Sequence, residues 1–119
     1  MRAYLATNKD EVLGFLESGS LDAQVIYAPT IKFLTNNSDL DEEEAEYEIS
    51  LRAAHESDGL VLAVEIPENL VDQHLEDTIT VKGPLLWEYV ECLFTFSVDS
   101  DGEEELSWYA TQEIKECLA

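Results

Sequence analysis

The chain has 119 residues, a usual size for one folded domain, and 45% of them are hydrophobic. Its formal charge is −21, because 27 acidic residues stand against six basic ones. That balance excludes direct nucleic-acid binding, which needs clustered Lys and Arg, and binding to anionic membranes. It favours a basic protein surface, a polyamine or a metal cation as partner. The simpler alternatives are a well-solvated surface and a salt-adapted host.

The first predicted elements are a strand and a helix. Residues 2–6 are expected to form a short strand, with no signal peptide or membrane span at this end. Thr7 or Asn8 can cap a following helix, which should end at a Ser-Gly pair. Residues 23–28 are the next strand candidate and stop before a proline. Residues 30–34 are expected to make one or two helical turns.

Residues 38–58 fit two patterns. Apolar and polar residues alternate through the middle, as in a strand, yet Tyr47 and Leu51 also fall on one helical stripe. We predict a helix, because Ser38 and Asp41 fit a capping box, the first turn is acidic, and neither Gly nor Pro interrupts the segment. Tyr47 and Leu51 are then expected to point into the core.

The second half of the chain is rich in strand patterns. Four strands are predicted, at residues 60–66, 78–82, 89–98 and 106–111. Within the third of these, alternation predicts one common face for Val90, Cys92, Phe94, Phe96 and Val98. Residues 67–75 are expected to form a loop or short helix, and 112–118 a short helix or an extension of the last strand. These elements predict a single α/β (α+β) domain over residues 1–119, with helices packed on a mixed five- or six-stranded sheet.

Three blocks resemble a family of small uncharacterised actinobacterial proteins. They are the opening 1–7, the acidic block 41–47 and the C-terminal block 106–114, whose sequence LSWYATQEI is the most specific. The chain departs from the family at Ala6, where relatives often carry proline, and it is shorter between the central strands. The resemblance implies one small cytoplasmic domain in an actinobacterial setting. It transfers no activity and no catalytic residue.

Metal and cofactor motifs are not evident. Cys92 lies in an apolar run and is expected to be a buried, inert thiol, while Cys117 is expected to be free. Residues 99–105 have the oxygen density of a calcium loop but lack its D-x-D-x-D-G frame, so a solvated hairpin turn fits as well. No His/Cys pair has zinc-ligand spacing. We therefore predict no metal and no cofactor.

Catalytic patterns are equally weak. Asp72, His74 and Asp77 could be drawn as a base with an orienting acid, but no nucleophile accompanies them. The glycines are isolated, so there is no phosphate-binding loop. No catalytic residue is assigned, and an enzyme of unidentified type stays an alternative.

Binding is the function that the composition favours. Glu42, Glu43, Glu44 and Glu46 are predicted to form an anionic patch at a helix start, which would dock a basic partner; the alternative is a solvated helix face. Trp108 and Tyr109 are adjacent in a strand and cannot share one buried face, so one of them is a candidate for a surface position, as in many interfaces; the alternative, which is the more common case, is that helices cover both faces of the strand. We predict a non-catalytic protein–protein interaction domain using these six residues. The alternatives are a DNA-mimic inhibitor and self-association into a homodimer.

Overall fold

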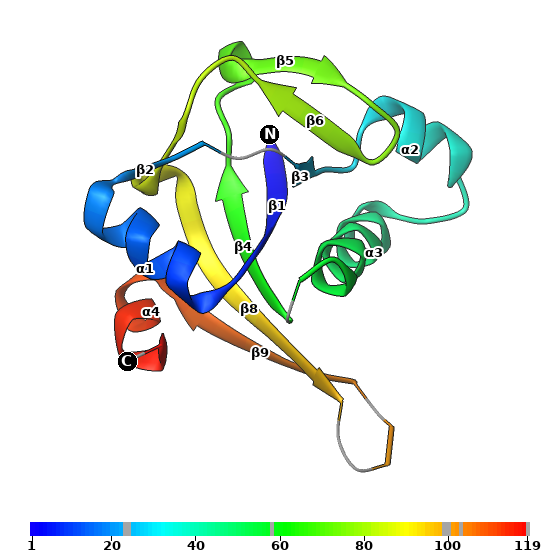
Figure 1. Ribbon diagram of the computed structural model, residues 1–119. Helices are drawn as coiled ribbons and strands as arrows, with labels where there is room; N and C mark the ends of the chain where they lie inside the picture. Colours follow the sequence, from blue (N-terminus) through cyan, green and yellow to red (C-terminus); the bar gives the residue numbers. More distant parts are fainter. Residues whose placement is uncertain (23–24, 58, 99–100, 103, 119) are drawn as a thin grey trace.

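Seven strands form one sheet in the computed structural model, which describes residues 1–22, 25–57, 59–98, 101–102 and 104–118 (Figure 1). From one edge to the other they are β5 (Val71–His74), β6 (Thr78–Val81), β3 (Ile26–Tyr27), β1 (Arg2–Thr7), β4 (Leu60–Glu65), β8 (Val90–Val98) and β9 (Glu104–Ala110). A separate two-stranded sheet pairs β2 (Ser20–Leu21) with β7 (Leu85–Leu86). The 3₁₀ turns η1 (Glu68–Leu70) and η2 (Trp87–Tyr89) precede β5 and β8. The predicted α+β domain with helices packed on one main sheet is confirmed.

The sheet differs in detail from the prediction. It has seven strands rather than five or six, and every described strand pair is antiparallel rather than mixed. The extra strand is β5, which lies in the segment 67–75 expected to be a loop or helix. Its residues Asp72 to His74 are exposed at the sheet edge, so they lack the apolar alternation that marks a half-buried strand.

Helices cover both faces of this sheet (Figure 1). They are α1 (Lys9–Ser18), α2 (Ile31–Asn36), α3 (Glu42–His55) and α4 (Thr111–Leu118). One face carries α1 and α4, where Phe15 and Ile114 join Leu62 and Leu93 in a fully buried cluster. Asn8 caps α1 and Gly19 ends it in the left-handed conformation, as the sequence predicts.

The opposite face carries α3, whose inward side was predicted wrongly. Ala45, Ile49 and Ala53 are buried against β1 and β4, whereas Tyr47 is 49% exposed and Leu51 only half-buried. The buried residues are spaced four apart, so they follow one side of the helix. Small alanines let the helix lie close to the sheet, and Tyr47 is turned away from it.

The start of α3 also differs from the prediction. The capping box is formed by Asp41 and Glu44, not by Ser38 and Asp41. The Asp41 carboxylate accepts from the Glu44 backbone N–H at 2.8 Å, and the Glu44 carboxylate accepts from the Asp41 N–H at 3.4 Å. Ser38 lies in the preceding turn, one helical turn too early.

A β-bulge corrects the predicted face of Val90. Ala63 pairs with Cys92 but Val64 pairs with Val90, so one extra residue, Glu91, is inserted in β8. The insertion turns Val90 to the α1/α4 face, while Cys92 and its successors Phe94 and Phe96 face the α3 side. Cys92 is buried, as predicted. The side chain of Val98 and the turn residues 99, 100 and 103 lie outside the described residues.

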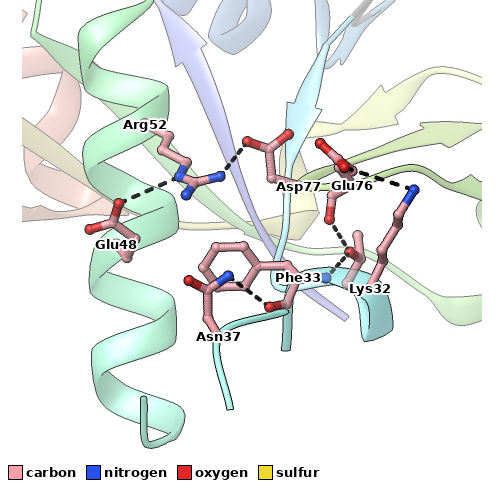
Figure 2. Close-up of polar contacts among 8 residues, drawn as sticks. Lys32, Phe33, Asn37, Glu48, Arg52, Glu76 and Asp77 are labelled. Carbon is pink, nitrogen blue, oxygen red and sulfur yellow. Dashed lines mark hydrogen bonds and ion pairs between the residues drawn. The ribbon is translucent and has the colours of Figure 1, made fainter. Parts of the chain in front are cut away.

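Arg52 joins α3 to the β5–β6 turn and to α2 (Figure 2). Its guanidinium contacts Asp77 at 2.9 Å and Glu48 at 3.5 Å, and it lies over the Phe33 ring at 5.0 Å. In the same cluster Lys32 pairs with Glu76 at 3.8 Å. Two of the six basic residues are thus used to hold the helices of this face to the sheet edge.

Candidate functional site

A groove of about 680 Å³ separates the start of α3 from the start of β1. Its apolar lining comes from α2, α3 and the segments before them, and consists of Pro29, Leu34, Leu40 and Ala45. Its carboxylates come from the start of α3 and the end of β4, and are Asp41, Glu42, Glu46 and Glu65. Met1 and Arg2 complete the lining at the β1 side. The groove therefore combines an apolar surface with an acidic rim.

Strand register and helix periodicity bring these carboxylates together. β1 and β4 pair antiparallel with Arg2 opposite Glu65, so the end of β4 lies beside the beginning of the chain. Glu42 and Glu46 are four residues apart and therefore share one side of α3. Burial raises the pKa of Glu46, and although Arg2 opposes this rise, the neighbouring carboxylates Glu42, Glu65 and Glu43 add to it.

Cations neutralise only part of the groove. The Met1 ammonium contacts Glu65 at 2.9 Å, and Arg2 pairs with Glu91 of β8. Within the described part of the chain, Glu42 and Glu46 take part in no ion pair. Negative charge thus remains along the α3 side of the groove.

The four predicted glutamates of α3 are divided between two places. Glu42 and Glu46 line the groove, whereas Glu43 and Glu44 border a second, shallower hollow of about 490 Å³ beside Tyr47. Glu44 is also committed to the capping box. The predicted anionic patch is therefore narrower at the groove than the run of acids in the sequence indicates.

The two predicted aromatic residues lie on opposite faces of β9. Tyr109 is half-buried against the α1/α4 cluster, and Trp108 is 58% exposed on the α3 side. Of the two alternatives, an exposed aromatic or helical cover on both faces, the structure has the first. Trp108 is paired with Phe94 across the β8–β9 ladder, on the same side of the sheet as Cys92. Burial raises the pKa of the Cys92 thiol, and the side chains of Trp108 and Arg2 oppose part of the rise.

Sequence reasoning did not find Glu65, Arg2 or the apolar lining. Glu65 ends an apolar strand and Arg2 begins another, and nothing local marks either as part of a site. The signal that would have placed them is the antiparallel pairing of β1 with β4, which is a long-range contact. Leu34 and Leu40 belong to short segments with little pattern of their own.

Catalytic chemistry finds little support in this groove. Among the described residues its lining contains no Ser, Cys or His, so within that part of the chain Glu46, whose pKa is raised, has no nucleophile or imidazole beside it in the groove. Elsewhere, Asp77 of the Asp72, His74 and Asp77 set is ion-paired with Arg52. Among the described residues no group of three or more His, Cys, Asp or Glu could hold a metal ion. The candidate calcium loop at 99–105 includes residues 99, 100 and 103, which are outside the described ranges.

Over the same ranges, no helix has both the length and the hydrophobicity needed to cross a bilayer. Comparison with protein-family models, with curated proteins and with solved structures found no match. The case for a function therefore rests on the geometry of this chain alone.

Proposed function

We propose that this chain is a non-catalytic cytoplasmic domain that binds a basic segment of another protein in the groove between α3 and β1. The observation that carries the proposal is the combination of apolar lining and acidic rim, with Glu42 and Glu46 outside the ion pairs of the described residues. A segment with Lys or Arg beside aliphatic side chains matches both parts of that lining.

The electrostatics of Glu46 support a cationic ligand. Its pKa is raised by burial and by the neighbouring carboxylates Glu42, Glu65 and Glu43. A bound cation would favour the charged form of Glu46 and would therefore lower this pKa again. Binding should release protons at mildly acidic pH and weaken as pH falls, because protonated Glu46 no longer attracts the ligand.

The apolar part of the groove distinguishes this proposal from the DNA-mimic alternative. A mimic needs carboxylates spaced like phosphates and would gain nothing from Pro29, Leu34 or Leu40 at the centre of its binding surface. A basic protein segment gains affinity from those residues as well as from the charges. The mimic nevertheless stays an outcome of the experiment, since its target would be a nucleic-acid-binding protein.

The test compares two double variants with equal charge. E42Q/E46Q removes two groove carboxylates, and E17Q/E116Q removes two exposed carboxylates from α1 and α4 on the opposite face. Affinity for a short Lys–Leu peptide is measured by fluorescence polarisation at low and moderate salt. We expect E42Q/E46Q to bind about tenfold more weakly than E17Q/E116Q, which should bind like the wild type. Equal losses in the two variants would show that net charge alone attracts the peptide, and the proposal would fail.

A further inference from the structure

One part of the sheet lies outside the helical cover on the α3 side. α3 packs on β1, β3 and β4, whereas α4 packs on β8 and β9 from the opposite face. On the α3 side of the β8–β9 ladder, Phe94 and Phe96 are only half-buried and Trp108 is 58% exposed. The Phe94 ring is 6.4 Å from Tyr4 and 6.3 Å from Phe96, so Trp108 borders a row of aromatic rings that leads back to β1.

Arg2 connects this aromatic row to the groove. Its guanidinium lines the groove, pairs with Glu91 and lies 3.9 Å from the sulfur of Cys92, two residues before Phe94, which pairs with Trp108. Arg2 and Glu46 both line the groove, and the charge of Arg2 opposes the rise that burial causes in the pKa of Glu46. The surface therefore runs from the carboxylates of α3 across the partly exposed Arg2 and Glu91 to the β8–β9 ladder that carries Trp108, while Cys92 itself is buried.

We propose that this surface takes a single basic segment, whose cationic side chains lie along Glu42 and Glu46 and whose apolar side chain packs on Trp108. This inference rests on the proposed function and adds the apolar anchor of the partner. Tryptophan is among the residues enriched at the few positions that supply most of the binding energy in protein interfaces.

Charge favours this occupant over a second copy of the chain. Two copies would bring together surfaces that each belong to a chain of net charge −21, with Glu91 and Glu46 near the contact. A basic segment meets the same carboxylates with opposite charge. The partner is therefore expected to carry Lys or Arg and at least one large apolar residue within the same short stretch.

Two peptides and two matched variants of the full chain test the anchor. The peptides are the Lys–Leu peptide and a matched Lys–Gly peptide without apolar side chains. The variants are W108A and V25A; Val25 is 49% exposed and lies beside carboxylates in a different hollow, so it is the control. We expect W108A to lose about tenfold in affinity for the Lys–Leu peptide and nothing for the Lys–Gly peptide, and V25A to bind both like the wild type.

A spectroscopic measurement tests the same contact without removing Trp108. In a W87F background Trp108 is the only tryptophan, because the chain has two. The Lys–Leu peptide should shift its emission to the blue, and the Lys–Gly peptide should not, because only the former excludes water from the ring.

The outcomes separate this inference from the proposed function. If E42Q/E46Q loses affinity but W108A behaves like V25A, the groove binds the peptide and the Trp108 anchor is overturned. If W108A loses affinity but E42Q/E46Q does not, the proposal that one segment contacts both the groove carboxylates and Trp108 is overturned. If the chain without peptide forms a dimer in analytical ultracentrifugation that W108A abolishes, a second copy covers Trp108 and the inference is again overturned.

Discussion

The two faces of the sheet differ in how far the helices cover them. Under α1 and α4, the large residues Phe15, Leu62, Leu93 and Ile114 are buried completely, and Phe15 packs edge-on against Trp87 at 5.2 Å. On the other face α3 covers β1 and β4 with Ala45, Ile49 and Ala53, and Trp108 lies outside this helical cover. The comparison indicates that the face under α1 and α4 supplies most of the stability of the fold. The uncovered part of the α3 face, on β8 and β9, is available for binding.

The largest expected loss of stability comes from the face of the sheet that α1 and α4 cover. F15A should lower the free energy of unfolding by about 3–5 kcal/mol, because it leaves a cavity in a fully buried cluster. W108A should change it by less than about 0.5 kcal/mol, as is usual for exposed positions. Urea unfolding followed by circular dichroism measures both. A W108A loss comparable to that of F15A would mean that Trp108 is part of the core.

The next effect concerns the turn that leads from α3 into β4. Gly59 has φ of +88°, and a Cβ there would collide with the Phe96 carbonyl oxygen, which belongs to the backbone of β8. G59A should therefore destabilise the fold by about 2 kcal/mol or more. G14A is the matched control, because no heavy atom lies within 4 Å of a Cβ at that helical position. If both variants unfold at the wild-type urea concentration, the turn does not have this geometry.

Arg52 tests how firmly the α3 face is attached to the sheet edge. R52Q removes the contacts with Asp77, Glu48 and the Phe33 ring. It should lower the free energy of unfolding by only about 1 kcal/mol, because partly exposed ion pairs contribute little. K115Q removes one positive charge from α4 and should cost less than about 0.5 kcal/mol. Thermal unfolding at low and high salt compares the two. Equal losses of stability in R52Q and K115Q would show that the removed charge, and not the contacts of Arg52, accounts for the effect.

The smallest effect is the pH dependence at Glu46. Its pKa is raised from 4.5 in the folded state, so the folded protein holds this proton more tightly than the unfolded chain does. The charged form therefore disfavours folding at neutral pH, and this penalty disappears once the pH falls below 4.5. E46Q should unfold at slightly higher urea than the wild type at pH 7, and the difference should shrink as pH falls through the folded-state pKa. If the difference in urea midpoint between E46Q and the wild type grew at low pH, the pKa of Glu46 would not be raised in the folded state.

Local signals predicted much of the fold. Asn8 and Gly19 delimit α1, and apolar runs mark β4 and β8, because capping and burial are short-range properties. The wrong predictions concern residues whose orientation is set by contacts with segments that are distant in the sequence. Val90 changes face because of a bulge opposite β4, and Tyr47 is exposed because the small residues of α3 are the ones pressed against the sheet.

The candidate site could be predicted only in part. Glu42, Glu46 and Trp108 stand out in the sequence as acids at a helix start and an aromatic in an alternating strand. Their connection through Arg2, and the presence of Glu65, depend on the order of strands β1, β4 and β8. Composition predicts a basic partner, and the groove that we propose for it is defined only by the tertiary arrangement.

Mapping the Lys–Leu peptide onto the protein by NMR chemical-shift changes tests the central claim most directly. We expect the largest changes at the backbone amides of Glu42, Glu46 and Glu65 and at the indole N–H of Trp108, with little change in α1 and α4. Changes spread evenly over exposed acids on both faces, including Glu17 and Glu116, would contradict the account, because the peptide would then be following net charge and not the groove.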